Sequence, residues 1–423
     1  MIYAYWTELR RSALRWWLPV LVAADLTVLY ERGRWWIGVW PQTSVAAQIP
    51  AFYFGPLCAA LAAWSAGRAS RQGMDEQLAA AARPRWQAEG LQLAGTASFG
   101  LAAYLVGIVV AAVTSAGSAG PGFLWPGYLL LGATVIVGCT AVGHALGRWS
   151  QSRIIAPMFG ALVCFVLLGS LSGTLGFMVL VGPPDARVAY WPLATRLLLT
   201  VAAVAVAVSV PKPQLRLPRP AHRHYGCGQA FSATTAVMAF AGCLAAYATA
   251  GPIQVIRPMP ADYPCTDTMP AICVWPDDQK YLPRLSAMAS RLGELPAGQF
   301  TVPARFYEQG LRGSQYRNVD FTIPEGAMWE VATAISIQIV GETFPKACTG
   351  ATDDDTAAFF HAEFELGTWL ESRLTGAPQP SSVHGGPPGV DIQAIGRLIY
   401  TTQESQLAWV RQRMATIRNT TCA

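Results

Sequence analysis

The sequence predicts an all-α polytopic membrane domain of about seven transmembrane helices, followed by a mainly α (α+β) extracytoplasmic domain. Two observations lead to this prediction. Hydrophobic residues make up 52% and charged residues 13% of the 423 residues, a composition that soluble domains seldom show. Residues 1–251 contain 17 Arg and Lys against 7 Asp and Glu, whereas residues 252–423 contain 13 against 18. We therefore expect a basic membrane domain over 1–251 and an acidic soluble domain over 252–423.

Seven apolar runs stand out in the first domain, each bounded by Arg, Pro, Gly or Trp. Crossing a bilayer takes about 20 mostly apolar residues, so each run is predicted to be a span. The runs cover residues 16–30, 45–66, 91–116, 125–147, 154–182, 192–210 and 228–250.

The first run has two interpretations. Its basic front and the small residues in LVAADL also fit a cleaved secretory signal. The aromatic segment RWWIGVW that follows it favours an anchor whose outer end stays at the membrane interface. Ahead of it, YAYWTELRRSALRWW mixes Arg with Tyr, Trp and Leu at helical spacing, which predicts a helix lying on the inner membrane surface.

The distribution of positive charge predicts the orientation of the spans. Arg and Lys in loops are retained in the cytoplasm. With the amino terminus inside, 13 of them fall on inner segments and only Arg32, Arg34, Arg187 and Arg196 on outer ones. We therefore expect a multi-pass protein of the cell membrane with its carboxyl-terminal domain outside. The inner residues are Arg10, Arg11, Arg15, Arg68, Arg71, Arg83, Arg85, Arg148, Arg153, Lys212, Arg216, Arg219 and Arg223.

The nine cysteines agree with this topology. Five of them, Cys58, Cys139, Cys164, Cys227 and Cys243, lie in or beside the predicted spans. The other four lie in the exported domain, where an even number indicates two disulfides. Of the three possible pairings, we favour Cys265 with Cys273 and Cys348 with Cys422. A zinc site is disfavoured because no Cys-x-x-Cys pair or neighbouring His completes a ligand set.

The exported domain is predicted to be mainly helical. One helix is expected over about 281–295, with Asp277 or Asp278 able to cap its start. A second is expected over 355–374, preceded by an acidic cluster that suits the positive end of a helix dipole, and a third over about 391–418. The segment RNVDFTIPEG, residues 317–326, is expected to supply a strand.

The sequence contains no catalytic signature that we recognise, so no catalytic residue, metal site or cofactor is predicted. His361 and Glu365 are one helical turn apart but do not form His-Glu-x-x-His, and a structural or solvent-facing role is expected. His144 falls inside the fourth span near Arg148. An ionisable group there is a functional candidate by default, although snorkelling to the interface is the simpler interpretation.

A charged segment, residues 65–90, separates the second and third spans. Within it, MDEQLAAAA contains strong helix formers with Asp75 and Glu76 early and Arg83 after the end, an order that suits the helix dipole. Gly73 precedes this helix, and Pro84 ends it because proline cannot continue the hydrogen-bond pattern. The segment is either a solvated hairpin or a helix that docks on a cytoplasmic partner.

The surface helix, about six spans and this segment together resemble the permease subunits of type-2 ABC exporters. The resemblance covers roughly residues 1–210, and the Arg-rich style and the CVWPDD entry to the exported domain also resemble actinobacterial membrane proteins encoded beside ABC ATPases. The matching positions in the segment are Arg68, Arg71, Gly73, Asp75, Glu76, Leu78, Arg83 and Pro84.

In the family, the corresponding segment is a coupling helix that sits in a groove of the ATP-binding subunit. The resemblance therefore implies a separate ABC ATP-binding subunit, a second permease subunit and membrane lipids as partners, and no nucleic acid. It implies export of a peptide, lipid or antibiotic-like molecule, with ATP hydrolysis in the partner rather than in this chain. The seventh span and its exported domain depart from the family pattern. They leave a second hypothesis open, a membrane-anchored extracytoplasmic sensor or binding protein without transport activity.

Overall fold

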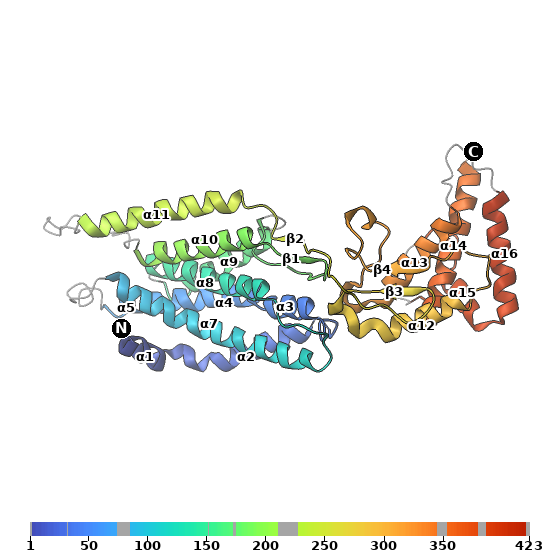
Figure 1. Cartoon of the computed structure of the whole chain (residues 1–423). Coiled ribbons are helices and arrows are strands. Elements are labelled where there is room, and N and C mark those ends of the chain that lie inside the picture. The colour runs from blue at the N-terminus through green and yellow to red at the C-terminus, as the bar shows by residue number, and fades with distance from the viewer. Residues whose placement is uncertain are drawn as a thin grey trace. The chain divides into compact units, whose positions relative to one another are not determined.

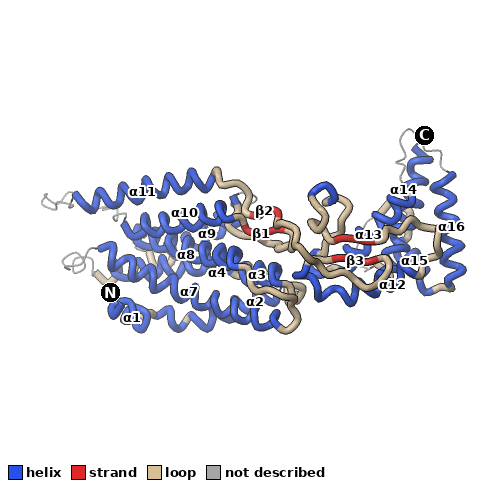
Figure 2. Tube along the Cα trace, viewed as in Figure 1, coloured by secondary structure: helices blue, strands red, loops and turns tan. Residues whose placement is uncertain are grey.

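The chain forms two compact units. The computed structural model describes residues 2–31, 33–73, 85–150, 152–171, 175–209, 227–344, 353–379 and 386–419. The first unit consists of residues 1–118, 122–182 and 186–255, and the second of residues 119–121, 183–185 and 256–423. Helices dominate both units (Figure 1), and the strands are short (Figure 2).

Most of the first unit is helical. Its helices are α1 (Ile2–Arg11), α2 (Leu18–Glu31), α3 (Trp40–Gln48), α4 (Ala51–Ala66), α5 (Arg68–Arg71), α7 (Arg85–Ala116), α8 (Pro126–Trp149), α9 (Ile155–Ser170), α10 (Tyr190–Ser209) and α11 (Cys227–Ala248). The 3₁₀ turn η1 (Ala13–Trp16) joins α1 to α2. Strand β1 (Ala186–Val188) pairs with β2 (Gln254–Ile256) in a two-stranded sheet.

Several of these helices could cross a membrane. Four apolar stretches are long enough: Trp40–Ala66, Trp86–Ala116, Pro126–Trp149 and Tyr190–Ser209. The bent pair Ile2–Arg10 and Leu14–Glu31, with 59° between its parts, makes a fifth if it counts as one span. Helix α9 ends at Ser170 instead of continuing to the predicted residue 182. Its 16 residues rise about 24 Å, which is less than the roughly 30 Å of a hydrocarbon core.

Helices α4 and α8 pack with their backbones in close approach. Gly143 and Gly147, one turn apart on α8, lie directly against the backbone of Ala59 and Ala63 on α4, and a Cβ atom at either glycine would overlap a carbonyl oxygen of α4. Small residues at four-residue spacing on both partners are typical of helix pairs in membranes, because they allow backbone contact. Around this contact, the core includes Phe54 and Ile136. The pair α4 and α8 therefore forms the rigid centre of the first unit.

The second unit combines a small parallel sheet with helices. Strand β3 (Ala271–Cys273) pairs in parallel with β4 (Arg305–Tyr307), with Ile272 opposite Phe306. The 3₁₀ turn η3 (Pro276–Tyr281) leads into α12 (Leu282–Gly293), and the remaining helices are α13 (Met328–Thr343), α14 (Asp353–Thr375), α15 (Ile392–Arg397) and α16 (Gln403–Asn419). The short 3₁₀ turns η4 (Ser314–Tyr316), η5 (Pro324–Gly326) and η6 (Leu398–Tyr400) complete the unit.

The predicted disulfide between Cys265 and Cys273 is present. It closes a loop beside β3, where the two cysteines also form an antiparallel bridge. The other predicted pair, Cys348 and Cys422, lies outside the described residues.

Three sequence predictions for the second unit need correction. The predicted strand over 317–326 contributes only an isolated bridge from Phe321 to Glu308, and residues 324–326 form η5. The predicted helix over 391–418 is interrupted at Thr401 and Thr402, where the Thr402 hydroxyl accepts a hydrogen bond from the Ser405 N–H at the start of α16. Asp277 and Asp278 do not cap a helix, because they lie within the first turn of η3 and are buried.

Helix α13 has no counterpart among the sequence predictions. Its buried residues Val331, Ile335 and Ile339 recur at four-residue spacing, and the helix packs against α14. The same spacing of apolar residues in the sequence predicts a helix here.

Candidate functional site

The predicted docking positions occupy residues 68–84 of the charged segment, between the end of α4 and the start of α7, and this stretch is called segment 68–84 below. Arg68 and Arg71 belong to the short helix α5. Gly73 follows with a φ of 69°, in the left-handed region that glycine adopts readily. The other predicted site residues, Asp75, Glu76, Leu78, Arg83 and Pro84, lie outside the described residues. The structure therefore defines the flanks of the segment.

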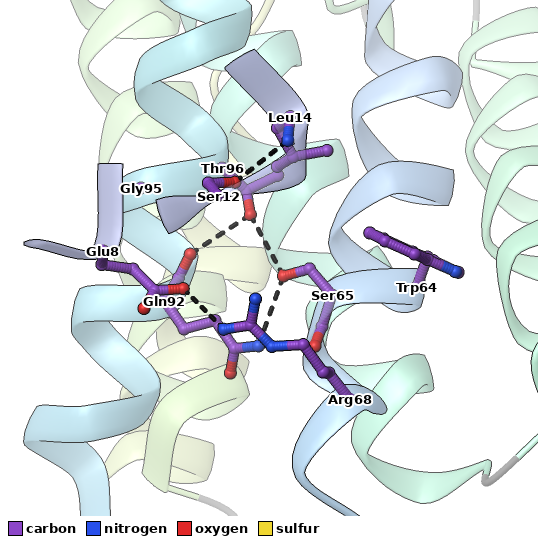
Figure 3. Close-up of a pocket in the computed structure, with 9 residues that line it drawn as sticks. All are labelled: Glu8, Ser12, Leu14, Trp64, Ser65, Arg68, Gln92, Gly95 and Thr96. Atoms are coloured by element: carbon purple, nitrogen blue, oxygen red, sulfur yellow. Dashed lines mark hydrogen bonds and ion pairs between the residues drawn. The ribbon is translucent and has the colours of Figure 1, made fainter. Parts of the chain in front are cut away.

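Helix α1 contacts both α5 and α7. The Arg68 guanidinium donates to Glu8 Oε1 on α1 at 3.0 Å, and Figure 3 shows these two side chains facing each other. The Tyr5 hydroxyl lies 2.6 Å from Ser98 Oγ on α7. The Arg68 and Glu8 side chains are 39% and 31% exposed, so this ion pair adds at most about 1 kcal/mol of stability.

Polar contacts also join the end of α4 to α7. The Gln92 side-chain amide donates to the Ser65 carbonyl oxygen at 2.5 Å, and Ser65 Oγ lies 3.4 Å from Thr96 Oγ1. These side chains and the Glu8–Arg68 pair line a cavity of about 10 Å³ (Figure 3). Small-molecule sites usually have about 300–1,000 Å³. This region is therefore a junction between helices rather than a ligand pocket.

Arg71 is engaged within the chain. It donates to the Trp64 carbonyl oxygen, near the carboxyl end of α4, at 2.6 Å. Partial burial, and then the positive charges of Arg153 and Arg68, lower the pKa of Arg71. Three arginines therefore gather at this end of the first unit, where they would attract anionic headgroups or an acidic partner surface.

A buried ionic network follows one turn after the segment ends. Glu89, near the start of α7, lies with Oε2 at 3.1 Å from His144 Nε2 and with Oε1 at 3.4 Å from Arg148 Nε. Arg148 also donates to the Ala207 carbonyl oxygen of α10 at 2.6 Å. His144 is fully buried, so the interpretation that it snorkels to the interface is wrong: Glu89 provides a partner inside the bundle.

Sequence reasoning identified His144 and Arg148 but missed their partner. The two residues are four apart on α8, so they face one side of that helix. An acid within the first turns of the neighbouring apolar helix was the signal that could have identified Glu89, because buried charges are normally paired.

Successive turns of α7 therefore contact different helices. Glu89 contacts α8, Gln92 and Thr96 contact α4, and Ser98 contacts α1. A force applied to the segment 68–84 would act on α7 at its first turn and on α4 at its last. The arrangement can transmit motion into the bundle.

The second unit contains a buried pair of carboxyl groups. Glu308 is 2% exposed and accepts a hydrogen bond from the Trp275 N–H at 2.8 Å. The Asp278 carboxyl group is fully buried and within hydrogen-bonding range of Glu308. Burial raises the pKa of Asp278 to about 7 against the opposing effects of the Glu308 hydrogen bond and Lys280, and burial beside Asp278 raises the pKa of Glu308. Both carboxyl groups therefore hold a proton to a higher pH than exposed carboxyl groups do.

An open apolar groove also lies in the second unit. Its volume is about 310 Å³, at the lower end of the range for small-molecule sites. The lining comes from the end of α12, the segment after it and the loop before β3, and includes Met269, Pro270, Leu292, Pro296, Phe300 and Val302. Such a surface suits an apolar rather than a charged ligand.

Among the described residues, no three His, Cys, Asp or Glu side chains gather as a metal site would require. Glu365, one turn from His361 on α14, pairs with Arg413 at 2.6 Å. Comparisons with known proteins find no matching family, no matching curated protein and no matching solved structure.

Proposed function

We propose that this chain is the membrane-spanning permease subunit of an ABC exporter of the type-2 class and works with a separate ATP-binding subunit. In this proposal the segment 68–84 is the coupling helix, the first unit spans the cell membrane seven times with its amino terminus inside, and a second permease subunit completes the pathway. The second unit lies outside the cell. The cargo class is a peptide, lipid or antibiotic-like molecule.

The observation that supports the proposal best is the attachment of the segment at both flanks. On one side Arg68 and Arg71 join it to α1 and to the end of α4. On the other, Glu89 joins the start of α7 to His144 and Arg148 on α8. Burying charges costs free energy unless they are paired. A solvated hairpin would not require such a buried ionic network at its carboxyl-terminal flank.

Charge reversal within the segment tests the proposal. The double variant Asp75→Lys with Glu76→Lys keeps good helix formers, so the chain should still insert and fold. The variant should no longer co-purify with the ATP-binding subunit from native membranes, and the associated ATP hydrolysis should be absent. The matched control is Asp262→Lys with Glu404→Lys, which makes the same change in net charge at two exposed positions of the second unit. Unchanged co-purification and ATPase activity in the Asp75 and Glu76 variant would refute the docking role.

A cysteine-accessibility experiment in intact cells tests the proposed topology. A thiol introduced at Gln379 should react with a membrane-impermeant reagent, and one introduced at Gln77 should not. The reverse pattern would invert the orientation and rule out docking at segment 68–84 from the cytoplasm.

The second candidate function is a membrane-anchored extracytoplasmic sensor or binding protein. The apolar groove of about 310 Å³ in the second unit favours it, because a binding module needs a ligand surface in its exported domain. A conformational change of the second unit on binding a ligand would favour this function over transport, provided that charge reversal in segment 68–84 has no effect.

A further inference from the structure

Helix α2 carries a single acidic side chain in the middle of its buried face. Leu21, Asp25 and Leu29 are its buried residues, at four-residue spacing. Leu21 packs in the cluster that contains Ala51 and Phe54, and Leu29 packs in the cluster that contains Ala46 and Ala47. Asp25 therefore lies halfway along the helix, about 10 Å from either end at 1.5 Å per residue. Its neighbours on the buried face are therefore apolar on both sides.

The Asp25 carboxyl group is fully buried and unpaired. Its exposed fraction is 0%, and within the described part of the chain neither oxygen has a hydrogen-bond partner. Glu89, the acid near the start of α7, contrasts with it because Glu89 is held by His144 and Arg148. Glu89 thus has cationic partners in the bundle, whereas the described residues offer Asp25 none.

Helix α7 makes room for this carboxyl group. Gly107 faces it so closely that a Cβ atom at position 107 would overlap the Asp25 carboxyl oxygens. The titratable group of α7 within electrostatic range is Tyr104, whose hydroxyl donates to the Leu129 carbonyl oxygen at 3.2 Å. On η1, which also packs on α2, Arg15 donates to the Arg10 carbonyl oxygen. The cation of η1 is thus engaged elsewhere.

A second unsatisfied polar group lies at the end of α3. Gln48 ends α3, between Ala47, which packs in the cluster of Leu29, and Ala51, which packs in the cluster of Leu21. It is 0% exposed, and neither atom of its amide group has a hydrogen-bond partner among the described residues.

An unpaired carboxylate in this position would be strongly disfavoured, because an isolated buried charge costs far more than a buried neutral polar group. We propose that Asp25 is a proton-binding site inside the membrane domain, occupied by a proton while α2 and α7 are packed together. Release of the proton requires water to reach the carboxyl group, and therefore requires α2 to separate from Gly107. This site is independent of the proposed ATPase docking.

Carbodiimide labelling of the full chain in native membranes tests the proposal. Dicyclohexylcarbodiimide enters apolar regions and adds to protonated carboxyl groups without a leaving group, so the peptide gains the full reagent mass. Mass spectrometry should find the adduct on Asp25 and not on Glu89, with labelling that decreases as the pH rises. The Asp25→Asn variant should lose the adduct, and Glu89→Gln should keep it.

Infrared spectroscopy provides a measurement that does not depend on reagent access. The purified chain should show the C=O stretch of protonated carboxylic acids, to which Asp278 and Glu308 also contribute. Asp25→Asn should lose one component of this band while remaining folded by circular dichroism. A carboxylate band at Asp25 at neutral pH would overturn the proposal. Protection of Asp25 from the carbodiimide by sodium or potassium ions would also overturn it, because the carboxylate would then bind a cation instead of a proton.

Discussion

Glu89 on α7 and His144 on α8 lie 3.1 Å apart in the interior of the first unit, and Arg148 shares the same carboxylate. Replacing Glu89 with Ala should leave the Arg148 guanidinium without its carboxylate, although its bond to Ala207 would remain. Breaking a buried pair from one side costs about 3–5 kcal/mol. The expected result is a clear loss of thermal stability in detergent.

A double-mutant cycle separates pairing from packing at this position. Glu89→Gln alone and Arg148→Met alone should each destabilise the protein. The double variant should be more stable than the sum of the two single effects predicts, because the two charges are then removed together. If the two single effects simply add, the network makes no specific contribution.

The close contact of α4 and α8 gives a second prediction. Gly143→Ala should destabilise the first unit by about 1–3 kcal/mol, because the added Cβ atom overlaps the backbone of Ala59. Gly138→Ala on the same helix is the matched control, since a Cβ atom there meets Thr200 at an ordinary 3.6 Å. Thermal unfolding of both variants in one detergent measures the difference. Equal stability of the two would show that α4 and α8 separate easily.

Much of the fold follows from sequence periodicity. A helix lies in each of the seven predicted apolar runs, although α9 ends at Ser170 within the run 154–182, because a helix satisfies its backbone hydrogen bonds internally. The partner of His144 could not be predicted, because pairing Glu89 with α8 depends on which helices are neighbours, and hydropathy does not report that. The buried state of Asp278 was missed for a similar reason: an acid just ahead of an apolar periodic segment is typical of a helix cap, and only the fold brings Glu308 next to it.

The disulfide between Cys265 and Cys273 gives a third prediction. The two cysteines are 8 residues apart, and closing so short a loop contributes about 2–3 kcal/mol in the chain-entropy description. Replacing both cysteines with Ser should lower the unfolding temperature of the second unit, and a reducing agent should have the same effect on the unmodified chain. Cys243→Ser is the control, because Cys243 is a free cysteine of the first unit. A reducing agent that leaves the unfolding temperature unchanged would contradict the expectation.

The paired carboxyl groups of Asp278 and Glu308 make the second unit sensitive to pH. The pKa of Asp278 rises from 3.8 to about 7 on folding, chiefly because of burial. Between these two values the folded chain holds a proton that the unfolded chain has released, so stability falls as the pH rises from about 4 to about 7 and then levels off for this group. The shift corresponds to a stability change on the order of 4 kcal/mol.

Asp278→Asn isolates this effect. The amide resembles the protonated acid and cannot ionise, so the variant should equal the unmodified chain near pH 4 and become progressively more stable than it towards pH 7. Hydrogen exchange of the segment around residues 271–282 in the full chain measures the local stability at each pH. Asp262→Asn, at an exposed position, should follow the unmodified chain throughout. If Asp278→Asn also follows it throughout, or loses stability at neutral pH, Asp278 is ionised in the folded protein and burial does not raise its pKa.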